Sequence, residues 1–327
     1  MASEKYDKDY QRFLSDQLKR FQSLKKLNED EIIEISPTAA LPDNINKNRY
    51  NDVLAIENTL VSSNSSSESE YINANHVWGR GSKPECSRFI ATQGPMAHTI
   101  NTFWSMIFYQ RSKTIVMLTN LFESGRFKCN LYWPVKTNSP HEYGQVQVTL
   151  LSLENNQHFV HRRFKIELLN SEEEPFEVDQ YHYGKWADHG VPNTTDGIRE
   201  ILSKIQDADG PVTVHCSAGI GRTGVFIAIR FLLQEIKDDT VTIEDLDPVE
   251  MVKIMRTQRT GVVQTDEQFV FILRFLQERI NELKGEPSAE ITSRRQLSTT
   301  IGFERSGDLV SHGKEEGEGD DVLMFSD

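Results

Sequence analysis

Ten residues in the last third of the chain, His215-Cys-Ser-Ala-Gly-Ile-Gly-Arg-Thr-Gly224, separate a short apolar run from a longer one. The preceding run, Pro211 to Val214, has the β-branched residues of a buried strand. The following run, Thr223 to Ile236, has the length and apolar content of a helix. A strand, a glycine-rich turn and a helix in this order predict an α/β fold in which the turn lies at a helix N-terminus.

Three interpretations of this loop compete. Its three glycines satisfy GxGxxG, the dinucleotide-binding fingerprint, and the flanking strand and helix fit that motif. A nucleotide P-loop is excluded because Val225 follows the last glycine where that motif requires lysine. In the third interpretation, Cys216 is a nucleophile and Arg222 closes a phosphate-binding turn, with five residues between them.

The chemistry of an anion site favours the third interpretation. Successive backbone N–H groups of a turn rich in Gly and Ala can converge on one anion, and the helix N-terminus adds partial positive charge. The guanidinium of Arg222 can bind two phosphate oxygens, and the same surroundings favour the thiolate of Cys216 over the thiol. A dinucleotide site uses neither side chain. The simpler alternative, a buried structural cysteine on a tight turn, does not explain the whole ten-residue pattern.

Charge and cysteine content limit the class of protein around the loop. The 327 residues include 49 acidic and 36 basic ones, for a net charge of -13, which argues against a nucleic-acid or membrane-surface binder. Three scattered cysteines and no CxxC argue against a disulfide framework and a zinc site. No apolar run suggests a secretory signal or a spanning helix. We therefore expect a reducing compartment, cytosolic or nuclear.

Residues 1–284 and 285–327 differ in composition. The segment 285–327 has ten acidic and four basic residues and no sustained hydrophobic period, so we expect a disordered acidic tail. In 1–284, helical and strand patterns alternate without a repeat or linker, which predicts one α/β domain with a twisted mixed sheet flanked by helices. The expected helices are 10–27, 100–108, 196–205, 223–236 and 269–280, and the expected strands are 115–118, 146–150, 164–168 and 211–214.

The cysteine loop resembles the signature loop of the protein tyrosine phosphatases, in particular of their tyrosine-selective, non-receptor type. The similarity covers roughly residues 10–283 and rests on several motifs in the family's order, each of them weak alone. Besides the loop these are Asn48-Arg49-Tyr50, Glu70-Tyr-Ile-Asn-Ala74, Ala91-Thr-Gln-Gly-Pro95, Lys128-Cys129, Tyr132-Trp-Pro134, Trp186-x-Asp188 and Gln264-Thr-x-x-Gln268.

The resemblance implies a two-step reaction at Cys216. In the first step the thiolate takes the phosphoryl group while Asp188, which follows Trp186, protonates the departing phenolate. In the second step Gln264 positions the water that hydrolyses the cysteinyl-phosphate, with Asp188 now acting as base. Thr223 is implied to hydrogen-bond the departing thiolate. Without the family match, an Asp two residues before Gly190 would simply be interpreted as a turn residue.

The resemblance also implies how the substrate is held. Tyr50 matches an aromatic wall that stacks on the substrate ring, and Asp52 matches a carboxylate that grips the substrate backbone. Val53 lines the same wall, and Gly261 keeps the mouth of the pocket open. The other implied groups are the phosphate-binding Ser217, Ala218, Gly219, Ile220, Gly221 and Arg222, the second glutamine Gln268, His215 beside the nucleophile, and the supporting Trp186, Glu123, Lys128 and Arg256.

One motif departs from the family pattern. The acid loop of the family usually reads Trp-Pro-Asp followed by Phe, but here Ala187 and His189 flank Asp188. Alanine lacks the fixed φ of proline, and His189 is titratable, so we expect slower loop closure or an altered pH response. The chemistry is expected to be retained because Asp188 is present.

The tail contains one candidate regulatory site. Arg294 and Arg295 precede Ser298 by four and three residues, a spacing that basophilic kinases use, and a phosphate there would add negative charge. Short basic strings before a serine also arise by chance.

These observations predict an enzyme that hydrolyses protein phosphotyrosine without a metal or cofactor and counteracts kinase signalling. We expect a monomer located in the cytoplasm, with the nucleus as a second location. Its expected partners are phosphotyrosine-containing proteins rather than nucleic acid or membranes. The altered acid loop leaves open a phosphotyrosine-binding module with weak turnover. A dual-specificity phosphatase is the third alternative, which Tyr50 and Gln264 disfavour because they fit a deep, tyrosine-selective pocket.

Overall fold

A computed structural model describes residues 2–64, 70–82, 88–186, 190–236 and 240–285, with the backbone alone over residues 2–9. Contacts group Met1–Ala289 into one compact unit. Cys86, the predicted acid-loop residues Ala187, Asp188 and His189, and the features predicted in the tail beyond residue 285 lie outside these ranges. The division into a domain ending at residue 284 and a disordered tail therefore stays a prediction.

Within the described residues, a mixed sheet of eight strands forms the centre of this unit, in the order β1-β2-β10-β3-β9-β8-β7-β6. Strands β2, β10, β3 and β9 run parallel, and the others pair antiparallel. Strand β10 lies between β2 and β3, so the cysteine loop emerges from the middle of the sheet. In sheet order the bounds are Ala74–Val77, Phe89–Thr92, Val212–His215, Thr114–Met117, Phe176–His182, Val160–Leu168, Val146–Asn155 and Pro140–Tyr143.

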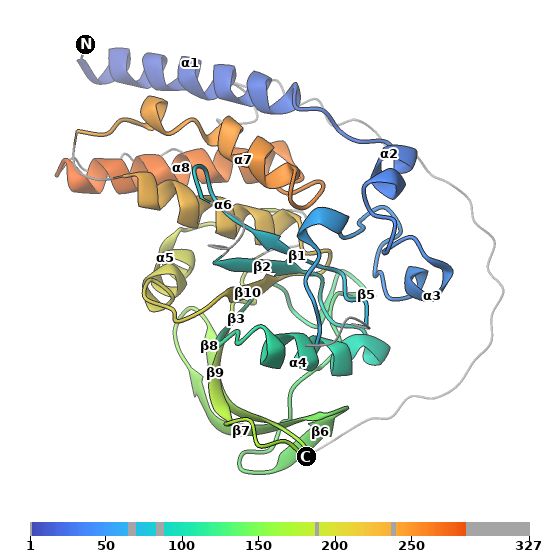
Figure 1. Ribbon diagram of the computed structural model, residues 1–327. Helices are drawn as coiled ribbons and strands as arrows, with labels where there is room; N and C mark the ends of the chain where they lie inside the picture. The colour runs from blue at the N-terminus through green and yellow to red at the C-terminus, as the bar shows by residue number, and fades with distance from the viewer. Residues whose placement is uncertain (1, 65–69, 83–87, 187–189, 237–239, 286–327) are drawn as a thin grey trace. The chain divides into compact units, whose positions relative to one another are not determined.

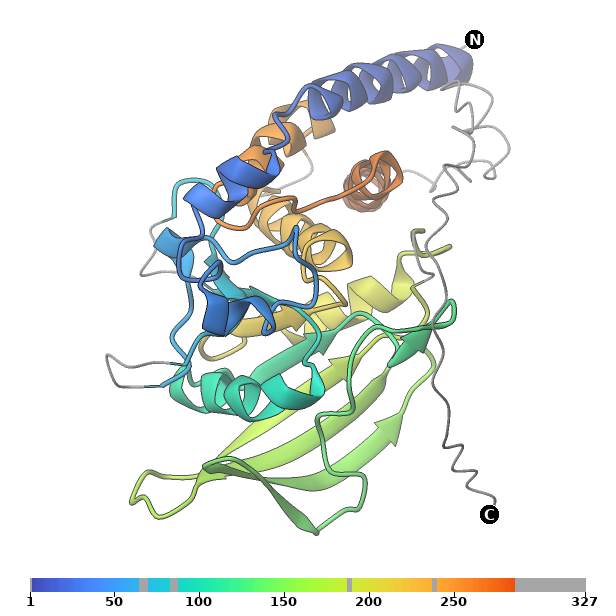
Figure 2. The same ribbon diagram turned by 90° about the vertical axis from the view of Figure 1, so that its right-hand side faces the viewer.

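Helices cover both faces of the sheet. Helix α4 (Ile100–Tyr109) packs on β6, β7 and β8, whereas α6 (Gly221–Glu235) packs on β2 and β10 from the other face (Figure 1). The second view agrees with this arrangement (Figure 2). The remaining helices are α1 (Ala2–Gln22), α2 (Glu29–Glu34), α3 (Pro42–Ile45), α5 (Asp196–Lys204), α7 (Pro248–Arg256) and α8 (Asp266–Leu283), and a short hairpin joins β4 (Phe122–Glu123) to β5 (Arg126–Phe127).

A group of large apolar side chains fills the space between α4 and the sheet. Phe103 and Trp104 of α4 are fully buried and contact Tyr132 and Phe164, with ring centroids 4.9 to 6.0 Å apart. The indole N–H of Trp104 donates to the Tyr132 carbonyl at 2.6 Å. This core therefore fixes the segment around Tyr132, which also reaches the cysteine loop.

The predicted α/β class and mixed sheet are confirmed, and most predicted elements are present with shifted ends. The helix after the loop begins at Gly221, two residues before the predicted start, because the loop turns directly into it. Strand β9 was not predicted. One of its buried residues, Gln180, is polar and has no exposed surface, so the buried side of this strand does not show an apolar pattern.

None of the helices in the described ranges combines the length and the apolar character that crossing a membrane requires.

Replacing Trp104 tests the core between α4 and the sheet. We expect Trp104→Ala to lower the free energy of unfolding by about 3–5 kcal/mol, because it leaves a large cavity and removes the bond to the Tyr132 carbonyl. Urea unfolding followed by circular dichroism measures the change. Leu153→Ala, on an exposed part of β7, is the matched control and should change stability by less than about 1 kcal/mol. Equal effects of the two substitutions would contradict this account of the core.

Candidate active site

The cysteine loop runs from the end of β10 to the first residue of α6. Cys216 is 5% exposed, and its Sγ accepts a hydrogen bond from the Gly219 N–H at 3.3 Å. Gly219 has φ of +73°, and a Cβ there would lie 2.1 Å from the carbonyl oxygen of Thr92. Only glycine adopts this φ without strain and lacks the Cβ that would clash with Thr92. The chain can therefore turn back over the sulfur at this residue.

The carbonyl groups of the loop point away from the sulfur because donors outside the loop hold them. Arg259 donates to the carbonyls of Gly219 at 2.7 Å and Ala218 at 3.0 Å, and the Gly94 N–H donates to that of Ser217 at 2.9 Å. In a planar trans peptide the N–H points opposite to the carbonyl. The N–H groups that follow these carbonyls are therefore directed to the inside of the loop, as an anion site requires.

Arg259 is a site residue whose role was not predicted from the sequence. Its side chain is completely buried and also donates to the amide oxygens of Asn73 and Asn75, at 2.8 and 2.7 Å. Burial lowers the pKa of Arg259 to about 10, so its guanidinium stays charged at neutral pH. In the sequence, only the position of Arg259 just before Gln264 indicated that it could belong to the site.

The carboxylate of Glu123 fixes the orientation of the Arg222 side chain. Its two terminal nitrogens donate to Glu123 in a bidentate pair at 2.9 and 2.7 Å, and one of them also donates to the Leu118 carbonyl at 3.0 Å. The two side chains are 9% and 7% exposed. The geometry fixes the plane of the guanidinium at the first turn of α6.

A two-residue hairpin turn positions Glu123. Ser124 and Gly125 have φ of 50° and 77°, both left-handed, which matches the tight turn favoured between twisted antiparallel strands. The Asn120 N–H donates to the same carboxylate at 2.8 Å. The resemblance implies that the loop with Glu123 meets the acid loop, which stays a prediction, and among the described residues Glu123 pairs with Arg222.

Tyr50, the residue predicted to form the aromatic wall of the pocket, lies beside the cysteine loop. The Tyr50 hydroxyl lies 2.9 Å from the Ser217 hydroxyl, and the preceding Arg49 binds the carbonyls of Gly94 and Pro95 at 3.0 and 2.8 Å. These bonds hold the Tyr50 segment against the segment that also supports the cysteine loop. The other predicted rim residues differ in exposure, since Asp52 and Gly261 are exposed and Val53 is buried.

Gln264 lies next to the start of α6. A Cβ on Gly221 would be 2.4 Å from the amide oxygen of Gln264, and the backbone N–H of Gln264 donates to the side chain of Gln268 at 2.9 Å. The preceding Val263 has φ of 58°, an unfavourable conformation for a β-branched residue, and its N–H donates to Ile220 at 3.0 Å. The strained turn brings Gln264 to the loop.

Arg256 supports the Gln264 segment from behind. It donates to the carbonyls of Val262 and Val263 at 3.1 and 2.9 Å, and its guanidinium lies 5.0 Å from the ring of Phe21. The resemblance leaves two roles open for Arg256, ordering the acid loop or holding a second anion, and both stay predictions because residues 187–189 lie outside the described ranges. Among the described residues, Arg256 holds the backbone that carries Gln264.

The segment with the predicted acid is described only at its ends. Trp186 is 1% exposed, packs on Phe271 at 5.8 Å, and donates from its indole N–H to the Gly190 carbonyl at 2.9 Å. This hydrogen bond therefore joins the two residues that flank the segment 187–189. The buried Lys128 follows the hairpin, and its N–H donates to the Leu121 carbonyl at 2.8 Å.

The two polar groups predicted beside the nucleophile are buried. The Thr223 hydroxyl is enclosed at the first turn of α6 and has no hydrogen-bond partner among the described residues. His215 is fully buried, and burial lowers its pKa to about 3, so its imidazole is neutral at physiological pH. Cys129 is also buried, and burial raises its pKa to about 12, so its thiol stays protonated at neutral pH.

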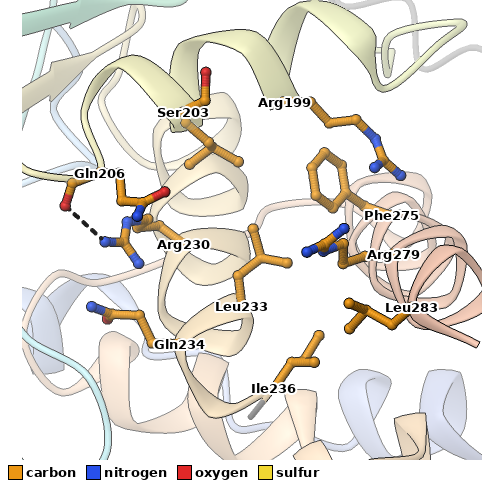
Figure 3. Close-up of a pocket in the computed structure, with 11 residues that line it drawn as sticks. Arg199, Ser203, Gln206, Arg230, Leu233, Gln234, Ile236, Phe275, Arg279 and Leu283 are labelled. Carbon is orange, nitrogen blue, oxygen red and sulfur yellow. Dashed lines mark hydrogen bonds between the residues drawn. The ribbon is translucent and has the colours of Figure 1, made fainter. Parts of the chain in front are cut away.

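A separate cavity of about 650 Å³ lies between α5, α6 and α8 (Figure 3). Its lining near α6 includes Leu233, eleven residues after Arg222, so the two are about 16 Å apart along the helix. The cavity is thus no part of the cysteine site. It is lined by Arg199, Leu202, Ser203, Gln206, Arg230, Leu233, Gln234, Ile236, Phe275, Arg279 and Leu283.

Comparison with known proteins agrees with this geometry. The family model described as protein-tyrosine phosphatase matches residues 44–278. Human receptor-type tyrosine-protein phosphatase H is 39% identical over 254 residues, which cover 73% of this chain and 22% of that protein. Mouse receptor-type tyrosine-protein phosphatase eta is 39% identical over 244 residues, covering 72% and 19%. Tyrosine-protein phosphatase 1 of Caenorhabditis elegans is 36% identical over 259 residues, covering 78% and 25%.

The match has two consequences. The chain spans about a fifth to a quarter of the length of these relatives, and the receptor-type names among them do not support the narrower resemblance to non-receptor phosphatases. The family itself is established by the model that covers most of the chain, including the cysteine loop, its arginine and the Gln264 segment. This chain belongs to the protein-tyrosine phosphatase family.

Proposed function

We propose that this chain hydrolyses phosphotyrosine in proteins through a cysteinyl-phosphate intermediate. The observation that carries the proposal is the loop itself, in which the sulfur of Cys216 lies under N–H groups directed inward and Arg222 closes the turn. Such a loop binds a phosphate dianion by its backbone and one bidentate guanidinium, and it places a nucleophile at the phosphorus.

In the first step the Cys216 thiolate attacks phosphorus, a sulfur–phosphorus bond forms, and the bond to the tyrosine oxygen breaks. The phenolate needs a proton, which we assign to the carboxyl group of Asp188. This residue lies outside the described ranges. The assignment is supported by the anchoring of its neighbours, because Trp186 and Gly190 hold the ends of the segment.

In the second step a water attacks the phosphorus of the cysteinyl-phosphate and the sulfur leaves as thiolate. Gln264, which lies beside the first residue of α6, is placed to orient that water, and Asp188 takes its proton. The Thr223 hydroxyl, buried without a partner among the described residues, is available to donate to the departing thiolate. Phosphate is then released and the loop is restored.

Selectivity for phosphotyrosine follows from the depth of the sulfur. Cys216 is buried, and Tyr50 stands at the loop with its hydroxyl on Ser217, so a substrate must reach past an aromatic wall. A phosphorylated serine side chain is too short for this. The dual-specificity alternative is therefore disfavoured, and the binding-module alternative is disfavoured by the assembled Arg222 and Gln264.

We further propose phosphotyrosine-containing signalling proteins as partners, a monomeric state, and a cytoplasmic location with the nucleus also open. These proposals rest on the net charge of -13 and on the cysteine content. The assignment to the non-receptor type stays a prediction that the receptor-type relatives do not favour. The pH response expected from Ala187 and His189, and regulation at Ser298, also stay predictions.

The nucleophile is tested by Cys216→Ser. We expect turnover of p-nitrophenyl phosphate to be abolished, because an alcohol at this position is not ionised at neutral pH. A rapid acid quench with labelled substrate should trap a phosphoprotein in the native chain and none in the variant. Ser203→Ala, in the distant cavity, is the control and should leave turnover unchanged. Undiminished turnover in Cys216→Ser would contradict the mechanism.

The bidentate arginine is tested by Arg222→Lys. Lysine keeps the charge but cannot bind two phosphate oxygens in one plane, so we expect kcat/KM to fall by about 100-fold, roughly 2.7 kcal/mol. Arg126→Lys, an exposed arginine on the adjacent hairpin, is the matched control and should stay within about twofold. A similar small effect of both substitutions would show that Arg222 acts only as a charge.

The aromatic wall is tested by Tyr50→Ala with Tyr50→Phe as its control. Removing the ring should lower kcat/KM for a phosphotyrosine peptide by about tenfold, because ring stacking is lost. The Phe variant keeps the ring and should retain most of the activity. Parallel assays with a phosphothreonine peptide complete the test, since an unchanged preference in Tyr50→Ala would favour the dual-specificity alternative.

A further inference from the structure

A continuous series of hydrogen bonds links residues of β8, β9 and β10 through Tyr132 and ends at the backbone of the nucleophile. Arg162 of β8 donates to the amide oxygen of Gln180 of β9 at 2.8 Å, and the Gln180 amide nitrogen donates to the Tyr132 oxygen at 2.6 Å. The Tyr132 hydroxyl lies 2.8 Å from Nε2 of His215, at the end of β10. His215 Nδ1 lies 3.2 Å from the carbonyl oxygen of Cys216.

The members of this series are enclosed in the protein. Gln180, Tyr132 and His215 have no exposed surface, and Arg162 is 9% exposed. The guanidinium of Arg162 also lies 4.5 Å from the ring of Trp133, a cation–π contact that holds it in place. In such surroundings an unsatisfied polar group is costly, so the direction of each proton matters.

The chemistry of the groups sets the direction of every bond. Arginine can only donate, so the atom of Gln180 that faces Arg162 is its oxygen, and the nitrogen must face Tyr132. An amide nitrogen can only donate, so the Tyr132 oxygen accepts and its own proton is free for another partner. The alternatives for that proton are Nε2 of His215 at 2.8 Å and the weakly accepting sulfur of Met117 at 3.9 Å. The proton therefore goes to His215.

This direction determines the tautomer of His215. A nitrogen that accepts from Tyr132 carries no proton, so the imidazole proton is on Nδ1 and is donated to the Cys216 carbonyl. The other titratable groups that act on His215 are His182 and Arg49, and both favour its neutral form together with burial. His182 is itself kept neutral, since burial and the adjacent Arg162 lower its pKa to about 4.

We propose that Gln180 and Arg162 are positioning residues for the nucleophile, acting through Tyr132 to hold His215 as its Nδ1–H tautomer. The donated proton fixes the peptide between Cys216 and Ser217, whose carbonyl is already confined, because a Cβ on Gly94 would lie 2.7 Å from it. That peptide contributes the first N–H of the phosphate loop. His215 thus acts on the backbone of Cys216 as a neutral donor. The catalytic part of this proposal rests on the proposed phosphatase activity.

The test reverses the direction of the series with Gln180→Glu. The carboxylate keeps the size of glutamine and pairs with Arg162, but it can only accept, so it takes the Tyr132 proton. The Tyr132 oxygen must then accept from Nε2 of His215, and Nδ1 becomes an acceptor facing the Cys216 carbonyl. Gln157→Glu makes the same change at an exposed position outside the series and is the matched control.

Two readouts separate positioning from folding. Nitrogen NMR of the labelled chain should show the Nδ1–H tautomer of His215 in the native protein and in Gln157→Glu, and the Nε2–H tautomer in Gln180→Glu. With p-nitrophenyl phosphate, kcat at neutral pH should fall about tenfold or more in Gln180→Glu, because the loop peptide is misplaced. The control should stay within about twofold in kcat.

The outcomes are distinguishable. If the native chain lacks turnover, the proposed function fails while the NMR measurement still decides the tautomer. A native Nε2–H tautomer, or a reversed tautomer in Gln180→Glu with unchanged kcat, would overturn the positioning role. If Gln180→Glu does not fold, Gln180→Met provides the test: it removes both bonds, and a single Nδ1–H tautomer with unchanged kcat in this variant would equally overturn the proposal.

Discussion

The buried guanidinium of Arg259 is the interaction on which the site depends. Removing a charged group from water is costly unless its hydrogen bonds are made, and here four of them are, to two loop carbonyls and to the amides of Asn73 and Asn75. The same bonds join the segment that follows α7, the start of strand β1 and the cysteine loop. Because the carbonyls are held outward, the opposite N–H groups form the anion site without a flexible side chain.

This arrangement explains how a chain with a net charge of -13 can hold a dianion. The favourable field is local: it comes from oriented peptide dipoles, the N-terminus of α6 and one guanidinium. Even that guanidinium is paired with Glu123 in the free protein. Because the pairing offsets part of the positive charge, it limits how strongly the site attracts anions in general.

The sequence allowed the fold class and the loop chemistry to be predicted because both depend on local patterns. A strand, a glycine-rich turn and an apolar helix follow one another in the chain, and the cysteine and arginine lie within that turn. Arg259 and Gln180 could not be found in this way, since each acquires its role from partners brought together by the sheet. A buried polar residue in the middle of a strand resembles a solvent-facing one until its neighbours are known.

The place of β10 between β2 and β3 has a consequence for the biosynthesis of the site. Both neighbours precede β10 by about a hundred residues in the chain, so the loop acquires its support only through contacts distant in sequence, which form slowly. Arg259 and Gln264 emerge from the ribosome later still. A growing chain therefore carries the cysteine for some time without the carbonyl restraints that make it a phosphate site. The proposed phosphate site is therefore complete only when the fold itself is complete.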